Sequence, residues 1–140
     1  MKLLIKKLHP EAKVPAFAHA TDAGLDLCTV GDVTLAPGER KSIATGIAMA
    51  IPEGYVGLVW DKSGIAHKGG LKTLGGVIDA GYRGEIFVGL LNTSDTPHTF
   101  TAGHKVAQIL IQAIVQPELV EADQLPEADR GEKAFGSTGA

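Results

Sequence analysis

Residues 42–60 read SIATGIAMAIPEGYVGLVW and decide the expected fold. Two apolar runs, residues 42–51 and 55–60, flank the sequence PEGY, in which Pro presets φ and Gly accepts a positive φ. Short apolar runs on both sides of a tight turn are typical of consecutive β-strands. This stretch therefore predicts two strands joined by a turn.

The same pattern continues in both directions along the chain. Runs rich in Val, Ile and Leu recur at residues 3–8, 86–91 and 106–115. PGER at 37–40 indicates another turn, and IDAGYRGE at 78–85 has the composition of a hairpin tip. We expect one short helical turn near Ser63, a candidate N-cap. Short strands at close spacing predict an all-β sandwich or barrel.

Size and composition indicate one globular domain. The chain has 140 residues, 44% of them hydrophobic and 18 of them glycine, which suits one core with many tight turns. After Gln116 the sequence becomes acidic and then glycine-rich, PELVEADQLPEADRGEKAFGSTGA. We expect a β domain over residues 1–125 and a flexible C-terminal tail over residues 126–140.

Charge and cysteine content argue against several classes of protein. A net charge of −3 gives no overall basic field for nucleic acid or an anionic membrane, so an anionic ligand needs local positive charge. The single cysteine, Cys28, can form neither an internal disulfide nor a clustered zinc site. No apolar run has the length of a signal peptide or of a membrane span. We expect a cytoplasmic protein with no nucleic-acid or membrane partner.

The last ten residues before Ala140 carry groups that suit a phosphate. In RGEKAFGSTG, residues 130–139, glycines free the backbone N–H groups, Ser137 and Thr138 add hydroxyls, and Arg130 adds a guanidinium fork. Composition alone nevertheless favours a disordered tail.

Five segments in order resemble the signature motifs of the trimeric dUTPase family. They are AGLDL at 23–27, DKSGIAHKGG at 61–70, GGVIDAGYRGE at 75–85, GHKVAQ at 103–108 and RGEKAFGSTG at 130–139. The resemblance implies a jelly-roll-like homotrimer whose active sites are shared between subunits. It also implies Mg²⁺-dependent hydrolysis of dUTP to dUMP and pyrophosphate, which keeps uracil out of DNA and supplies dUMP for thymidylate synthesis.

Four residues take catalytic roles by this resemblance. Asp79 orients and deprotonates the water that attacks the α-phosphate, although locally it could be an ordinary turn aspartate. Asp26 helps to hold Mg²⁺ through water while the phosphates bind the metal itself; locally it could lie on a solvated strand face. Ser63 donates to the oxygen bridging the α- and β-phosphates, and Gln108 contacts phosphates near the metal-bound waters. Locally these two could be a helix N-cap and an outward polar residue.

The resemblance also implies how the nucleotide is bound. The Tyr82 ring packs under the deoxyribose and excludes a 2′-hydroxyl, while backbone groups from about Gly76 to Tyr82 recognise uracil. Phe135 stacks on the base as the tail closes over the phosphates. The implied substrate-binding residues are Lys62, Ser63, Gly64, Gly76, Val77, Ile78, Asp79, Tyr82, Gln108, Arg130, Phe135, Gly136, Ser137 and Thr138.

Three residues depart from the family pattern. Lys62 and Lys105 replace the usual arginines and so keep a cation but lose the bidentate fork. Ala134 replaces a glycine in the tail. Arg83 and Glu85 are expected to serve structural ion pairing and are left out of the site.

Three other functions compete with dUTP hydrolysis. The related dCTP deaminases are similar in fold but resemble this chain less, because they use a glutamate in the strand after the hairpin, where residues 86–91 read IFVGLL. A zinc nucleobase deaminase needs a cysteine pair that the chain lacks. A non-catalytic trimeric module that only binds the nucleotide stays open, and release of pyrophosphate from dUTP separates it from the enzyme.

Overall fold

The computed structural model of the chain describes residues 1–132. These residues form mostly short strands with one short helix, as the sequence predicted. The elements are β1 (Leu4–Lys7), β2 (Leu25–Cys28), β3 (Val33–Leu35), β4 (Arg40–Ala44), β5 (Ile47–Ala50), β6 (Tyr55–Trp60), α1 (Ser63–Gly69), β7 (Leu71–Leu74), β8 (Val77–Ile78), β9 (Phe87–Asn92), β10 (His98–Phe100) and β11 (Lys105–Ala113).

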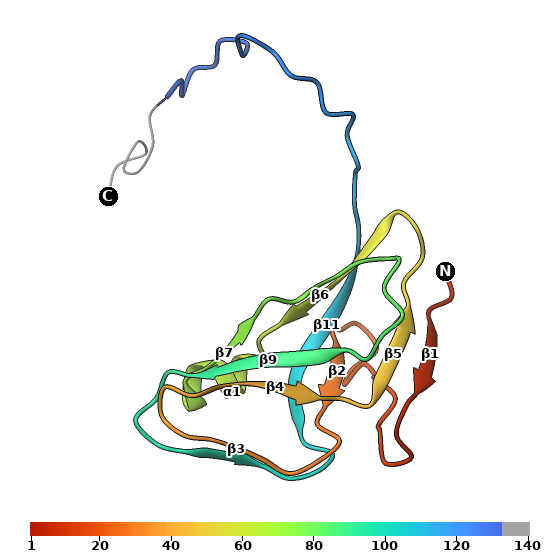
Figure 1. The fold of residues 1–140 in the computed structure, drawn as a ribbon, viewed down its shortest axis with the longest axis vertical. Helices are drawn as coiled ribbons and strands as arrows, with labels where there is room; N and C mark the ends of the chain where they lie inside the picture. Colours follow the sequence, from red (N-terminus) through yellow and green to blue (C-terminus); the bar gives the residue numbers. More distant parts are fainter. Residues whose placement is uncertain (133–140) are drawn as a thin grey trace.

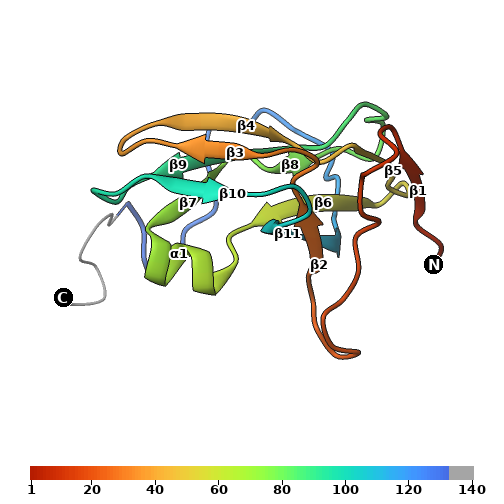
Figure 2. The same ribbon diagram turned by 90° about the horizontal axis from the view of Figure 1, so that it is seen from below.

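All strand pairs are antiparallel. One sheet has the order β2-β11-β6-β8 and another the order β4-β9-β7, while β1 pairs with β5 and β3 with β10. Figure 1 shows β11 running across the direction of β4 and β9, and Figure 2 shows β3 and β4 above β6 and β11. Since none of these paired strands is consecutive in the chain, the fold depends on long-range pairing.

The core lies between the sheets and draws on both of the larger ones. Its buried apolar residues are Ala12, Leu25, Leu27, Leu35, Ile43, Ile47, Met49, Ile51, Val59, Leu71, Ile86, Val88, Leu90, Phe100, Val106, Ala107 and Ile109. Strand β9 alternates accordingly, because buried Val88 and Leu90 flank a more exposed Gly89. Burial of one face of each sheet therefore sets the strand registers.

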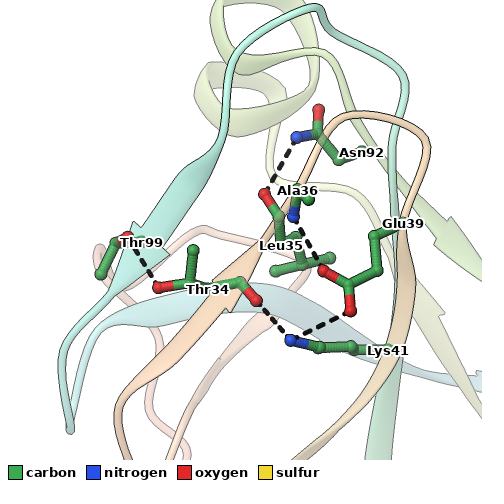
Figure 3. Close-up of polar contacts among 7 residues, drawn as sticks. All are labelled: Thr34, Leu35, Ala36, Glu39, Lys41, Asn92 and Thr99. Atoms are coloured by element: carbon green, nitrogen blue, oxygen red, sulfur yellow. Dashed lines mark hydrogen bonds and ion pairs between the residues drawn. The ribbon is translucent and has the colours of Figure 1, made fainter.

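Polar contacts tie β3 to its neighbours beside this core (Figure 3). Thr34 bonds to Thr99 of β10 at 2.8 Å between hydroxyl oxygens, and Lys41 Nζ of β4 donates to the Thr34 carbonyl at 2.6 Å. The fully buried Asn92 donates from Nδ2 to the Leu35 carbonyl at 3.2 Å. Its amide thus satisfies backbone groups that the sheets leave unpaired.

Both expected turns are present, and each uses its glycine at positive φ. Gly38 has φ 73° and Gly54 has φ 79°. The Tyr55 N–H donates to the Pro52 carbonyl at 3.2 Å and closes the second turn. The turn assignments at 37–40 and 52–55 are therefore confirmed.

The single strand expected over residues 42–51 is wrong, because the chain bends between β4 and β5. Gly46 has φ 65°, and the Thr45 hydroxyl donates to the Ile86 carbonyl at 2.6 Å. The two halves then pair with different strands, β4 with β9 and β5 with β1. The single apolar run in the sequence therefore contains a bend at which the chain passes from one sheet to another.

The hairpin expected at residues 78–85 is also wrong. β8 pairs with β6, whereas β9 pairs with β4 and β7, so the segment joins two sheets. At its far end the Ile86 N–H donates to the Ile47 carbonyl at 2.8 Å, and Glu85 Oε1 accepts from the Gly46 N–H at 2.7 Å. These bonds carry the chain to the second sheet. We call residues 76–85 the crossover loop.

After β11 the chain runs away from the strands (Figure 1). Residues 116–132 are exposed and form neither helix nor strand. The division of the chain at residue 125 stays a prediction. Among residues 1–132 there is no helix with the length and apolar character of a membrane span.

Candidate active site

A buried carboxylate on β2 holds two lysines from other parts of the chain. Asp26 is only 7% exposed, so the solvated strand face that its local sequence suggested is wrong. Lys62 Nζ, after β6, lies 2.5 Å from Asp26 Oδ1, and Lys105 Nζ, at the start of β11, lies 2.6 Å from Oδ2. Two of the family's expected arginine positions thus meet at one aspartate.

The electrostatics of this group favour an anionic ligand. Burial raises the pKa of Asp26, but the nearby Lys105 and Lys62 ammonium groups outweigh it, and the net pKa is lowered. The Asp26 carboxylate in turn raises the pKa of Lys105. Two basic side chains around one carboxylate give the group an excess of positive charge.

Gln108 occupies the centre of the same sheet. It pairs with Asp26 on one side and Trp60 on the other, and its side chain is half-buried between fully buried Ala107 and Ile109. Gln108 Nε2 donates to the Asp61 carbonyl at 2.9 Å. The predicted alternation of β11 is confirmed, and Gln108 lies next to the lysine–aspartate group.

The close packing of Gln108 depends on Gly24. A Cβ built on Gly24 would lie 2.2 Å from Gln108 Oε1 and 2.9 Å from its Cδ. Only a residue without a side chain leaves this space, so Gly24 allows Gln108 to lie flat against β2.

Ser63 begins helix α1 but does not cap it, which corrects the N-cap prediction. The N-cap is Lys62, with extended φ −84° and ψ 122°, and its carbonyl accepts from the Ile65 and Ala66 N–H groups at 3.0 and 2.9 Å. No side chain caps this end of the helix. Ser63 and Gly64 are exposed, and within residues 1–132 the Ser63 hydroxyl has no hydrogen-bond partner. It can therefore donate to a ligand.

The crossover loop borders a second candidate region, an open hollow of about 240 Å³. Its lining is Val77, Ile78, Asp79, Tyr82, Glu85 and Phe87. Four of these residues were predicted to contact the nucleotide. The Asp79 side chain is exposed and makes no hydrogen bond or ion pair with residues 1–132, so it can accept a proton from water.

Tyr82 is held at the edge of this hollow. Its hydroxyl donates to the Glu85 carbonyl at 2.8 Å, and 43% of the residue is exposed. Arg83 donates to the Ala80 and Tyr82 carbonyls at 2.5 and 2.7 Å. The ion pairing expected of Arg83 and Glu85 is not found within the described chain, because both side chains bond to backbone groups instead.

One chain does not bring the two regions together. Ile78 pairs with Gly57 of β6, whereas Asp26 is linked through Gln108 to Trp60. Strand rise and strand spacing put Ile78 and Asp26 roughly 17 Å apart within the sheet. Asp79 therefore lies far from the lysine–aspartate group of its own chain.

The structure describes only one of the tail residues predicted to bind the nucleotide. Arg130 is described and exposed, in a turn closed by the Gly131 N–H and the Ala128 carbonyl at 2.9 Å. The predicted residues Phe135, Gly136, Ser137 and Thr138, with Ala134, lie outside the described residues.

The site contains two residues to which the sequence assigned no role there, Asp61 and Gly24. Lys105 was noted as a departure from the family, and its ion pair with Asp26 depends on pairing between β2 and β11. Asp61 could have been found from the sequence, because it is a carboxylate in the two-residue connection between a predicted strand and a predicted helix. Gly24 could have been found as a glycine directly beside a strand.

The described residues contain no metal site made by protein alone. No group of three or more His, Cys, Asp or Glu side chains in residues 1–132 could hold a metal ion. Asp26 Oδ2 is buried and, despite the nearby Lys105 ammonium, has no directional hydrogen bond there. This oxygen fits a hydrogen bond from a metal-bound water, as Mg²⁺ sites with substrate phosphates use.

Comparison with known proteins identifies the family. The family model described as dUTPase matches residues 10–139. The chain is 46% identical to the deoxyuridine 5′-triphosphate nucleotidohydrolase of Thermobifida fusca strain YX, covering 99% of this chain and 79% of that protein. It is 49% identical to the protein of the same name from Bifidobacterium longum strain DJO10A, over 99% and 90%.

Solved structures agree with this result. A variant of the Staphylococcus bacteriophage 80alpha dUTPase with dUpNHpp has a TM-score of 0.94 and 33% identity, over 99% of both chains. A variant of the dUTPase from phage phi11 of S. aureus, whose structure concerns coordination of a structural Mg(II) ion, has a TM-score of 0.83 and 32% identity, over 89% of this chain and 98% of that one. The protein belongs to the dUTPase family.

Proposed function

We propose that this chain hydrolyses dUTP to dUMP and pyrophosphate, as a dUTP diphosphatase. The observation that carries the proposal is the placement of the family's motif residues in two complementary regions. One is a cationic group around Asp26 that suits phosphates, and the other is the crossover-loop hollow beside Asp79 that suits a nucleoside.

In the proposed mechanism, Asp79 accepts a proton from water as the water oxygen bonds to the α-phosphorus. The bond from that phosphorus to the α,β-bridging oxygen breaks, and this oxygen leaves with pyrophosphate. The Ser63 hydroxyl donates to the bridging oxygen as negative charge develops there. The unpartnered Asp79 carboxylate and Ser63 hydroxyl of the described chain support these roles.

The triphosphate binds at the group formed by Lys62, Lys105 and Gln108, with the Gly64 N–H as a further donor. The Asp26 carboxylate holds both ammonium groups in place. A bound Mg²⁺ would neutralise phosphate charge, with Asp26 accepting from its water shell. The Mg(II) described for the phage phi11 protein is compatible with this cofactor assignment.

The nucleoside binds in the hollow of the crossover loop. Backbone groups of Gly76, Val77 and Ile78 would read the uracil edge, and Tyr82 would exclude a 2′-hydroxyl. The bond from the Tyr82 hydroxyl to the Glu85 carbonyl fixes the ring for this role. In the proposed closed state, Arg130, Phe135, Gly136, Ser137 and Thr138 cover the base and phosphates.

We infer a jelly-roll-like homotrimer in which each site combines residues of different subunits. The roughly 17 Å between Ile78 and Asp26 in one chain supports this arrangement, because one α-phosphorus cannot contact both regions. Mixing inactive Asp26→Asn and Asp79→Asn chains should restore part of the activity. If the mixture stays inactive after subunit exchange, the sites are not shared.

A cytoplasmic location, without nucleic-acid or membrane partners, belongs to the same proposal. It is supported by the single cysteine and by the net charge of −3.

A pyrophosphate-release assay with Mg²⁺ and dUTP, UTP, dCTP or dTTP tests the function. We expect release from dUTP far above release from the other three. Absence of release from dUTP, with the nucleotide still bound, would favour the non-catalytic binding module.

A further inference from the structure

Asp61 connects the proposed phosphate-binding residues to the second sheet. It follows β6 directly and precedes Lys62 and helix α1. Asp61 Oδ1 accepts from the Thr73 N–H of β7 at 2.6 Å, and Oδ2 lies 2.5 Å from Lys72 Nζ. The Asp61 side chain is only 21% exposed, so these contacts are partly shielded from water.

The bond to Thr73 uses a backbone group at a sheet edge. In the order β4-β9-β7, β7 is an edge strand, and N–H groups on its outer side have no strand partner. The Asp61 carboxylate satisfies one of them. This bond fixes the connection between β6 and α1 to a strand of a different sheet.

The backbone of Asp61 holds a second site residue. Its carbonyl accepts from Gln108 Nε2 at 2.9 Å, and the next residue, Lys62, reaches Asp26 with its ammonium. The position of Asp61 therefore sets the location of the Gln108 amide and of the backbone from which the Lys62 side chain extends.

We propose that Asp61 is a positioning residue of the dUTP site: its carboxylate anchors the 61–62 connection to β7 and so places Lys62, Ser63 and the Gln108 amide for the triphosphate. This inference rests on the proposed function. The pKa of Asp61 is lowered, which agrees with this role. Burial raises the pKa, but the hydrogen bonds from Lys72 and Thr73 together lower it by a larger amount. The anchor thus stays ionised at neutral pH.

A purely structural role is the competing explanation, and Asp32 provides a matched control. Asp32 Oδ1 accepts from the Ala102 N–H at 2.8 Å, the same kind of bond in a part of the chain that touches no proposed site residue. Asp32→Ala should cost stability without changing turnover. Lys72→Ala removes only the half-exposed partner of the ion pair, and Asp61→Asn keeps an oxygen for the Thr73 N–H.

The experiment compares these variants with wild type as full-length proteins well below their melting temperatures. For Asp61→Ala we expect kcat/KM for dUTP with Mg²⁺ to fall at least about tenfold, because small displacements of positioned groups are costly. Asp61→Asn and Lys72→Ala should stay within about threefold of wild type, and Asp32→Ala within about twofold. The ¹⁵N signal of the Gln108 side-chain amide, assigned with Gln108→Ala, should shift in Asp61→Ala only.

Each outcome decides the inference. Folded Asp61→Ala with wild-type kcat/KM and an unshifted Gln108 amide would overturn it, as would Asp61→Asn impaired as strongly as Asp61→Ala. If Asp61→Ala does not fold, Asp61→Ser, which is too short for both contacts, takes its place with the same expectation. If wild type itself releases no pyrophosphate, the proposed function fails, and the Gln108 amide signal alone decides whether Asp61 positions that side chain.

Discussion

Gly24→Ala tests the close contact between β2 and Gln108. The added Cβ would lie 2.2 Å from Gln108 Oε1 and 2.9 Å from its Cδ. Gly24 has no positive φ, so alanine causes no backbone strain there. The clash falls on the Gln108 side chain alone, which must leave its place and give up its bond to the Asp61 carbonyl.

The size of the effect follows from two contributions. The atoms that clash are the flexible end of the Gln108 side chain, so we expect the low end of the overpacking range, about 1 kcal/mol. One lost hydrogen bond adds about 0.5–1.5 kcal/mol, so Gly24→Ala should destabilise by roughly 1.5–2.5 kcal/mol. Gln108→Ala alone should cost only about 0.5–1.5 kcal/mol. In the double variant Oε1 and Cδ of residue 108 are gone and only its Cβ, 3.1 Å away, remains, so Gly24→Ala should cost little more.

The assay is a double-mutant cycle measured by urea unfolding at one protein concentration, since an oligomer's stability depends on concentration. We expect a coupling free energy of at least about 1 kcal/mol between the two positions. Gly31→Ala is the control, because a Cβ built there meets nothing within 4 Å. Additive effects, with a coupling below about 0.5 kcal/mol, would refute the packing argument.

Four further predictions concern the reaction and its pH dependence. Asp79→Asn should fold and bind dUTP but turn over at least about 100-fold more slowly in steady-state assays; activity within a few-fold of wild type removes it from the mechanism. Tyr82→Ala should relax the rejection of UTP, and an unchanged dUTP-to-UTP ratio of kcat/KM would place ribose discrimination elsewhere. The pKa of Asp61 is lowered from 3.8 in the folded state, so the contribution of its contacts to the free energy of unfolding is present above pH 3.8. This contribution is lost as the pH falls through the lowered folded-state pKa. The Tm difference between wild type and Asp61→Asn should thus shrink as pH falls below about 4, and a constant difference contradicts this. Deleting residues 130–140 should leave Tm nearly unchanged but lower kcat/KM for dUTP strongly; full activity of the truncated chain would exclude the tail from the site.

The sequence predicted those parts of the fold that local pattern determines. The runs that became β6 and β11, and the turns at Gly38 and Gly54, follow from apolar content and glycine placement. The corner at Gly46 and the crossover loop were mistaken for a strand and a hairpin. Their conformations depend on partners distant in the chain, which local periodicity does not encode.

The candidate site likewise combines features that the sequence indicated with features that depend on partners distant in the chain. Family resemblance pointed to Asp26, but its local pattern suggested a solvated residue, and only the pairing of β2 with β11 buries it between two lysines. Asp61 was missed because Gln108 becomes its neighbour only when β6 pairs with β11, and Thr73 only when β7 of the other sheet packs beside it. The roles on Phe135, Gly136, Ser137 and Thr138 stay predictions.

Hydrolysis of dUTP in ¹⁸O-labelled water with Mg²⁺ tests the central claim most directly. Attack by an Asp79-activated water on the α-phosphorus places the label in dUMP and leaves pyrophosphate unlabelled. Mass spectrometry of both products separates the possibilities. Label in dUMP alone, lost together with turnover in Asp79→Asn, is the expected result. Label in pyrophosphate, or no cleavage of dUTP at all, would contradict the proposed reaction.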